Sequence, residues 1–326
     1  MSGPTRGALF ANEREIDQVL KKKNTIRAPM AAFECVICLS IINQLSKMPE
    51  LPEVETIATN LAPLIQTKII TKVWTSDLKM RSQLSEIDKQ FLPGKRVHNV
   101  TRVGKYLVIE FLEKYLLIHF GMSGRLIVTQ NALEMNKAPR SLQHIHLCLG
   151  FGDFLILYQD PRRFGSVRIV SKAGPKTTRQ LSKFLGIGFE PLSEEFGAKE
   201  LFYMTRGISR HIKIFLMDGK KVAGVGNIYA AEALFRAGIR PTLPCFKLSI
   251  AKCSQLVACL KSVLLKAISK GGSSLRDFSG LSGERGSFVD EHLVYGKREN
   301  CVICNADLQR MSIGQRTTTF CPRCQR

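Results

Sequence analysis

The pattern of apolar residues changes near residue 173, and this change most constrains the fold. Residues 67–172 contain short apolar or alternating runs separated by glycine and proline, which predict roughly eight strands. Residues 194–270 instead repeat apolar side chains at helical spacing. Because strands and helices are segregated along the chain, the sequence predicts an α+β protein, with a β-sandwich followed by a helical domain.

The expected elements have definite limits. One helix covers Glu53–Leu64, ahead of the strands, and the region Gly186–Pro191 is expected to be a hinge between the two domains. The predicted strands are Val73–Trp74, Lys95–Val100, Tyr106–Phe111, Tyr115–Phe120, Arg125–Thr129, His144–Leu149, Phe154–Tyr158 and Ser166–Val170. The later predicted helices are Glu194–Thr205, Ile208–Met217, Asn227–Ala237 and Ser249–Lys270.

Four cysteines near the C-terminus have the spacing of metal ligands. Cys301 and Cys304 form one CxxC pair, and Cys321 and Cys324 form a second pair sixteen residues later. This separation suits a β-hairpin between two knuckles and predicts a zinc ribbon with one structural Zn²⁺. Arg316 lies in the segment expected at the hairpin tip, beside several hydroxyls, where it is suited to bind phosphate.

The charge of the chain points to an anionic polymer as its partner. There are 48 lysines and arginines against 27 acidic residues, a formal net charge of +21. The excess is spread along the chain, which favours a nucleic-acid ligand over a merely basic protein. The apolar run 31–42 is too short to span a bilayer, and the cysteines outside the ribbon fit free thiols, so no membrane partner and a cytoplasmic location are expected.

The stretch that begins at Met48 has the features of a protein N-terminus. If the chain started there and lost Met48, Pro49 would carry a free secondary amine beside the acid Glu50. A terminal amine titrates near pH ~8, so a useful fraction is neutral and nucleophilic. An internal proline has no such amine. Residues 1–47 are therefore expected to be a mis-assigned start or a removed extension.

Several short motifs combine cations, glycines and apolar side chains. The first is His119–Gly124, with Met122 at a glycine-flanked tip, and the second is Asp160–Gly165, where an aromatic side chain next to two arginines suits opening a base stack. Lys105 precedes a predicted strand. Gly224–Gly226 precedes a predicted helix whose first residue, Asn227, is expected to cap it and to leave N–H groups for phosphate. Each motif alone is also compatible with an ordinary surface turn.

Taken together and in order, these motifs resemble the formamidopyrimidine-DNA glycosylases, within the group that includes endonuclease VIII. The resemblance runs from Met48 to Arg326. It implies an N-terminal catalytic β-sandwich domain at 48–180, a helix–two-turn–helix DNA-binding domain at 190–296 and a zinc-ribbon finger at 297–326. It also implies a base-excision repair enzyme with both glycosylase and abasic-site lyase activity, which acts as a monomer on double-stranded DNA.

The resemblance implies a role for each matching residue. Pro49 would be the nucleophile that forms a Schiff base, Glu50 the acid/base, and Lys105 a phosphate ligand near the sugar. The expected catalytic residues are Pro49, Glu50, Lys105 and Arg316; the DNA-binding residues are His119, Met122, Arg162, Arg163, Phe164, Asn227 and Tyr229; and the supporting residues are Glu53 and Glu232.

Leu51 and the Met122, Arg162 and Phe164 triplet resemble the purine-directed branch of the family. Oxidised guanine and ring-opened purines are therefore the expected substrates, with oxidised pyrimidines second. The polar loop 273–290 is expected to contact the extruded base. A catalytically silent protein that binds lesions or abasic sites, with Pro49 masked by the extension, remains an alternative. A zinc-ribbon nucleic-acid adaptor is a further alternative, but it leaves Pro49 and Glu50 unexplained.

Overall fold

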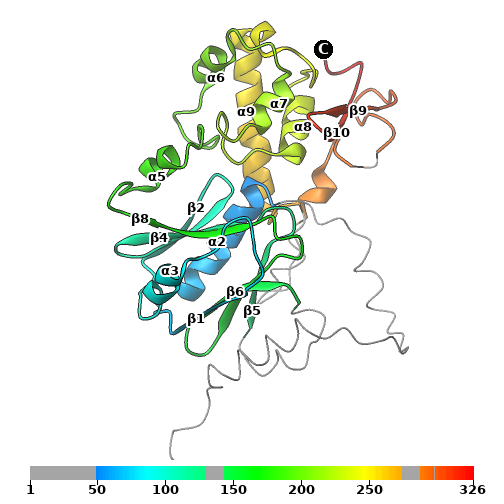
Figure 1. Ribbon diagram of the computed structural model, residues 1–326. Coiled ribbons are helices and arrows are strands. Elements are labelled where there is room, and N and C mark those ends of the chain that lie inside the picture. The colour runs from blue at the N-terminus through cyan, green and yellow to red at the C-terminus, as the bar shows by residue number, and fades with distance from the viewer. Residues whose placement is uncertain (1–48, 130–142, 274–286, 297) are drawn as a thin grey trace, which may run out of the picture.

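A computed structural model describes residues 49–129, 143–273, 287–296 and 298–326. Figure 1 shows a β-sandwich, a group of helices and a small hairpin at the C-terminal end. The α+β class expected from the sequence is confirmed, because β1–β8 form a sandwich that precedes the group of helices α6–α9, with the hairpin last. None of the described helices combines the length and the apolar character needed to cross a bilayer.

The sandwich consists of two antiparallel four-stranded sheets in the orders β1-β6-β7-β5 and β2-β3-β4-β8. Three connections, β1 to β2, β4 to β5 and β7 to β8, run from one sheet to the other. The apolar side chains of the two sheets meet in a common core. The strands are β1 (Lys72–Thr75), β2 (Asn99–Val103), β3 (Tyr106–Glu110), β4 (Lys114–His119), β5 (Arg125–Thr129), β6 (Ile145–Gly150), β7 (Leu155–Gln159) and β8 (Ser166–Ser171).

Several features differ from the sequence prediction. The helices expected from Glu194 and Ile208 begin four residues later, at Ala198 and Ile212. β2 begins at Asn99 rather than Lys95, because residues 95–97 pair with the chain near residue 69 instead of with β3. Helices α3 (Glu86–Phe91) and α5 (Thr178–Phe184) were not predicted. Both are short and bury at most one residue, so they lack a helical apolar pattern, and each begins at a serine or threonine cap.

Helix α2 (Leu51–Ile65) lies against the sandwich and carries the residues after Pro49. Its N-cap is Glu50, whose N–H donates to Glu53 Oε2 at 2.9 Å. Val54, Ile57 and Leu61 repeat at helical spacing and are buried in the core of the sandwich. Leu51 instead packs in the core of the helical domain, so the first turn of α2 joins the two domains.

The helical domain contains α6 (Ala198–Thr205), α7 (Ile212–Met217), α8 (Asn227–Arg236) and α9 (Ile250–Ser269), with 3₁₀ turns η2 (Cys245–Lys247) and η3 (Phe288–Glu291). Ser249 Oγ caps α9 by accepting from Lys252 N–H at 3.2 Å. The apolar face of α9, which includes Leu256, Leu260 and Leu264, packs against α6 and α8. The C-terminal hairpin, β9 (Gln309–Ile313) and β10 (Arg316–Phe320), contacts α8.

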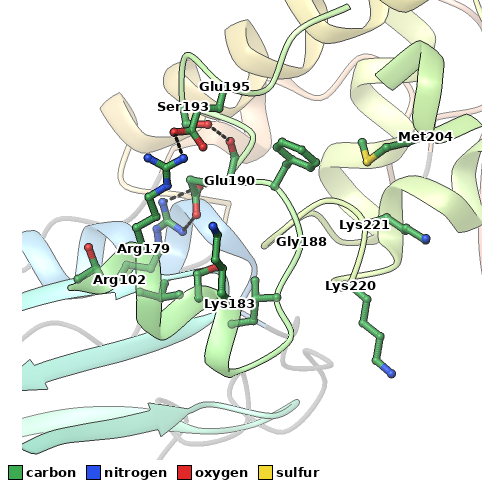
Figure 2. A pocket seen from close by; sticks show the side chains of 15 residues that line it. Arg102, Arg179, Lys183, Gly188, Glu190, Ser193, Glu195, Met204, Lys220 and Lys221 are labelled. Carbon is green, nitrogen blue, oxygen red and sulfur yellow. Dashed lines mark hydrogen bonds and ion pairs between the residues drawn. The ribbon is translucent and has the colours of Figure 1, made fainter. Parts of the chain in front are cut away.

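The two domains meet at a buried ion-pair joint beside a cavity of about 500 Å³, shown in Figure 2. Arg102 of β2 donates from Nη1 and Nη2 to both carboxylate oxygens of Glu190, at 3.0 and 2.9 Å, and from Nε to Glu55 at 2.7 Å. Its side chain is only 6% exposed; burial by itself lowers the pKa of the guanidinium, but Glu190 and Glu55 together outweigh burial and hold the pKa above the usual range. Because Glu190 lies in the connecting segment, this joint fastens that segment to the sandwich.

Candidate active site and DNA interface

Pro49 and Glu50 lie where the N-terminus of α2 meets the N-terminus of α8. Glu50 is buried, and its carboxylate oxygens accept the N–H groups of Ile228 at 3.1 Å and Tyr229 at 3.5 Å. The close approach requires a glycine at position 226, because a Cβ there would lie 2.2 Å from the Glu50 carboxyl carbon. Glu50 therefore caps a helix of the other domain, and Pro49, which is half-buried, lies next to it.

This arrangement corrects the expected role of Asn227 as a helix cap. Gly226 occupies the cap position of α8, and the free N–H groups of the first turn go to Glu50 rather than to phosphate. The Asn227 side chain instead accepts from Lys213 Nζ at 2.6 Å and donates to the Thr317 carbonyl at 3.2 Å. Its amide thus joins α7 and the hairpin.

Burial and opposite charges adjust the proton affinity of Glu50 and of Lys105 near it. Burial raises the pKa of Glu50 to about 7, although the nearby Lys105 ammonium opposes the shift. Burial lowers the pKa of Lys105, while Glu50 and Glu53 oppose that shift. A carboxyl group that titrates near neutral pH next to a candidate nucleophile can both give and take a proton.

The Glu53 carboxylate lies next to Glu50 and accepts hydrogen bonds from three segments of the chain. Glu53 Oε2 accepts from the N–H of Glu50, and Oε1 accepts from the Tyr229 hydroxyl at 2.5 Å and from the Ser273 N–H at 2.8 Å. The Tyr229 side chain is fully buried, and its pKa is raised well above normal, chiefly by burial. Its hydroxyl therefore supports Glu53 in the interior, and the DNA-binding role expected for Tyr229 stays a prediction.

Glu232 on α8 organises the chain that leads into the C-terminal hairpin. Its side chain is fully buried and accepts N–H groups of Leu293, Val294 and Tyr295 at 2.8–3.1 Å. Arg236 Nη1 pairs with the same carboxylate at 2.5 Å. Three backbone donors and one guanidinium satisfy this buried charge, which ties the hairpin to α8.

Lys213 is a buried cation that the sequence analysis did not select. Its Nζ donates to Asn227 Oδ1 and to Thr318 Oγ1, each at 2.6 Å, and so links α7, α8 and β10. Burial lowers its pKa to about 8, with Glu50 opposing and Arg316 reinforcing the shift. The available signal was a lysine within the apolar run of α7, where a charged side chain needs partners.

The four cysteines of the C-terminal finger come together as expected. Their sulfur atoms all lie within 4.8 Å of one another, with Cys301 and Cys324 3.8 Å apart and Cys304 and Cys321 3.5 Å apart. A tetrahedral zinc ion with Zn–S bonds of about 2.3 Å needs sulfurs separated by about 3.8 Å. The site fits one structural Zn²⁺, and the hairpin that it supports carries Arg316.

The two motifs predicted to open a base stack lie at two of the three connections between the sheets, β4–β5 and β7–β8. Met122 belongs to the β4–β5 connection, which follows His119 at the end of β4, and Arg162, Arg163 and Phe164 belong to the β7–β8 connection. Phe164 is 48% exposed, and the Arg162 guanidinium lies 4.9 Å from its ring centre. Both arginines are exposed. Burial and nearby cations lower the pKa of His119 to about 4, so its ring is neutral at physiological pH.

Comparisons with known proteins agree with this arrangement. Residues 48–167 match the formamidopyrimidine-DNA glycosylase N-terminal domain, 187–279 its H2TH domain, and 299–326 the zinc finger found in FPG and IleRS. Formamidopyrimidine-DNA glycosylases of Acinetobacter baumannii and Neisseria meningitidis are each 41% identical; the matches cover 85% and 86% of this chain and 97% and 100% of the relatives. The chain belongs to the formamidopyrimidine-DNA glycosylase family.

Solved structures of the family include complexes with damaged DNA. A Lactococcus lactis FPG mutant bound to Fapy-dG-containing DNA superimposes with a TM-score of 0.75 at 35% identity, covering 85% of this chain and 99% of that one. A Lactococcus lactis Fpg bound to abasic-site DNA gives a TM-score of 0.74 at 35% identity, with the same coverage. The family resemblance inferred from the motifs is confirmed, and the protein is a DNA glycosylase homologue with an FPG-type zinc finger.

Some expectations concern residues outside the described ranges. Met48 and the residues before it, and most of the loop 273–290, fall there. Of that loop, the structure describes Ser273 and the segment from Ser287 onward. The expected contacts of the loop with an extruded base therefore stay a prediction from the resemblance.

Proposed function

We propose that this protein excises oxidised purines from duplex DNA through a Schiff base on Pro49 and then cleaves the strand. The observation that carries the proposal is the Glu50 carboxyl group, which is buried beside Pro49 and has a pKa raised to about 7. A group of this kind can protonate a sugar oxygen and later accept a proton at neutral pH. Lys105 supplies positive charge close to it, and Arg316 lies near enough to Lys105 to act on its charge.

The proposed reaction begins with attack of the Pro49 amine on C1′ of the damaged nucleoside. The C1′–N bond breaks, the base leaves with the bonding electrons and a proton, and Glu50 protonates the ring oxygen so that the sugar opens to an iminium ion. The iminium acidifies the C2′ hydrogen, whose removal expels the 3′ phosphate by β-elimination. A second elimination releases the 5′ phosphate, and water hydrolyses the iminium to regenerate the amine.

The base must leave the helix before Pro49 can reach C1′. Met122, Arg162 and Phe164 are proposed to fill the space that the base vacates, and Arg163, Asn227 and Arg316 to hold the backbone. Unstacking costs a few kcal/mol, which phosphate contacts offset. Preference for oxidised purines over oxidised pyrimidines follows from the family, and since one chain supplies the whole set of residues, the enzyme is proposed to act as a monomer.

The proposal requires a free amine at Pro49. Within the 326-residue chain the Pro49 nitrogen is an amide without a hydrogen and cannot attack. A chain that begins at Pro49 and the full chain are mixed with duplex DNA containing 8-oxoguanine opposite cytosine, reduced with borohydride and mapped by mass spectrometry. The expected result is an adduct on Pro49 in the short chain and none in the full chain.

A second function follows if the extension persists, because it masks the Pro49 nitrogen. The protein would then bind lesions or abasic sites without cutting them. Tight lesion binding without an adduct in either chain supports this binding function and overturns the proposed catalysis. An adduct on a lysine instead of Pro49 overturns the assignment of the nucleophile.

A further inference from the structure

The two connections proposed to enter the DNA stack meet at one buried carboxylate, Asp160. We infer that Asp160 and Ser123 are positioning residues that hold the two connections as a single wedge. This inference rests on the proposed base-flipping function. It concerns the step in which the base pair is opened, not the chemistry at Pro49.

The two connections come from different parts of the sandwich. One leaves β4 and enters β5, and the other leaves β7 and enters β8. β4 pairs with β8 and β5 pairs with β7, so the ends of the two connections are held side by side. The strands fix only these ends, and contacts between the loops must fix the positions of Met122 and Phe164 relative to each other.

The Asp160 carboxylate supplies those contacts. It accepts the Ser123 hydroxyl from the first connection, the Gly165 N–H from the second at 2.7 Å, and the Tyr158 hydroxyl at 3.3 Å. Ser123 Oγ in turn accepts the Arg162 N–H at 3.1 Å. Asp160 is fully buried, so each of these hydrogen bonds acts in a medium of low polarity, where losing one is costly.

The backbone of Asp160 is fixed as firmly as its side chain. Its N–H donates to the His144 carbonyl at 3.0 Å, and its carbonyl accepts the Arg163 N–H at 3.1 Å. His146 Nε2 lies 3.0 Å from the same carbonyl, and His146 Nδ1 lies 2.9 Å from Ser76 Oγ. Since the carbonyl can only accept, Nε2 carries the hydrogen and Ser76 donates to Nδ1.

Glycines allow the two connections to approach this closely. A Cβ at Gly121, which has φ +59°, would lie 2.5 Å from the Gly165 nitrogen. A Cβ at Gly165 would lie 1.8 Å from the Tyr158 hydroxyl and 3.0 Å from Asp160. The backbones are therefore in direct contact behind the exposed side chains of Arg162 and Phe164.

The test uses two substrates and a chain that begins at Pro49. One is a duplex with 8-oxoguanine opposite cytosine, and the other has a one-nucleotide gap opposite the lesion, so that no base pair needs to be opened. Asp160→Asn keeps the shape of the side chain but weakens its acceptor capacity. We expect excision from the full duplex to slow by at least about tenfold, and excision from the gapped duplex to change by less than about twofold, since only the wedge is displaced.

Ser123→Ala is a second variant that leaves the buried carboxylate in place, and Ser123→Thr should recover activity because it restores the hydroxyl. Asp153→Asn is the matched control, because Asp153 lies in the β6–β7 turn with an 82% exposed side chain. Fluorescence of 2-aminopurine beside the lesion should rise more slowly with Asp160→Asn and Ser123→Ala than with the control.

Each outcome bears on the inference separately from the proposed function. Equal losses on both substrates would mean a general structural role and overturn the inference, as would an unchanged rate for Ser123→Ala and Asp160→Asn on the full duplex. If the unaltered chain that begins at Pro49 cuts neither substrate, the proposed function itself fails.

Discussion

At the scale of the residue, Glu50 shows how the environment changes the chemistry of one carboxyl group. It lies between the N–H groups at the start of α8 and the Lys105 ammonium, both of which favour its charged form. Burial nevertheless has the larger effect and raises its pKa to about 7. The raised pKa suits Glu50 to the proposed acid/base role, and it also means that ionising Glu50 lowers the stability of the folded state.

Glu50→Gln should therefore alter the pH dependence of stability in the full chain. Because the folded state holds the proton more tightly than the unfolded state, Glu50 stabilises the fold below pH 4.5, and this contribution is lost as the pH rises through about 7. Glutamine does not ionise, so at pH 8 the variant should be more stable than the unaltered chain by roughly 2–3 kcal/mol, relative to the difference at pH 4.5.

Urea unfolding at both pH values measures this difference. Glu86→Gln provides a control, because Glu86 has a 79% exposed side chain. Stability curves of the Glu50→Gln variant and the unaltered chain that run parallel from pH 4.5 to 8 would contradict the raised pKa.

Gly226→Ala tests the space that Glu50 needs. The added Cβ would overlap the Glu50 carboxylate, although the backbone at this position is extended and accepts alanine. In a chain that begins at Pro49, borohydride trapping should fall by at least about tenfold while DNA binding persists, because only the carboxylate moves. Gly219→Ala is the matched control, since a Cβ there meets nothing within 4 Å. Equal trapping by both variants would show that the position of Glu50 is unimportant.

At the scale of the element, the zinc finger is held to the helical domain by charged and polar side chains. Lys213 and Asn227 contact Thr318 and Thr317 of β10, and Glu232 fixes the segment that precedes the finger. The fold of so short a hairpin depends on its metal. The finger is therefore expected to place Arg316 only while zinc is bound.

Cys304→Ser should release zinc and weaken lesion-DNA binding by at least about tenfold, because the hairpin loses its fold and Arg316 its position. Fluorescence anisotropy with labelled duplex, together with a metal assay, measures both effects. Cys259→Ser, at a half-buried thiol of α9, should change neither. If Cys304→Ser released zinc but bound lesion DNA as tightly as the unaltered chain, the finger would not be part of the DNA interface.

Sequence patterns predicted most helices and strands, because the apolar spacing that marks such an element is a property of neighbouring residues. The strands β3 to β8 and helices α2 and α9 appear within a residue or two of the expected limits. Helices α3 and α5 were missed because their side chains are mostly exposed, so no apolar period marks them. Tyr229 was assigned to DNA binding from the resemblance, and no local pattern indicated that its side chain lies on the buried face of α8.

At the scale of the whole molecule, the joint at Arg102 connects the domains. Arg102→Met should lower the free energy of unfolding by roughly 2 kcal/mol, because it leaves Glu190 and Glu55, each about one-third exposed, without their partner. Arg179→Met is the matched control beside the same cavity (Figure 2), since the Arg179–Glu195 pair is exposed and should contribute less than about 1 kcal/mol. If urea unfolding showed that both variants lose the same free energy of unfolding, the buried joint would stabilise the protein no more than the exposed pair does.

The net charge predicts how binding responds to salt. Residues 1–47 hold seven basic and four acidic residues, so +18 of the net +21 belongs to residues 48–326. If Lys105, Arg163 and Arg316 each neutralise a phosphate, the logarithm of the affinity should fall with the logarithm of salt concentration with a slope of about −3 or steeper. Arg316→Ala should reduce this slope by about one. Anisotropy titrations at several salt concentrations measure the slope, and a flat dependence would contradict phosphate binding.

The sequence by itself determined the class of fold, the zinc ligands and the family, because apolar periods and cysteine spacing are local properties of the chain. Only the tertiary structure showed that Glu50 caps α8, that Lys213 bridges α7 to the finger and that Asp160 joins the two connections. Glu50 and Ile228 are 178 residues apart in sequence but 3.1 Å apart in space. The pKa of Glu50 depends on burial by such distant segments, and no pattern of neighbouring residues records it.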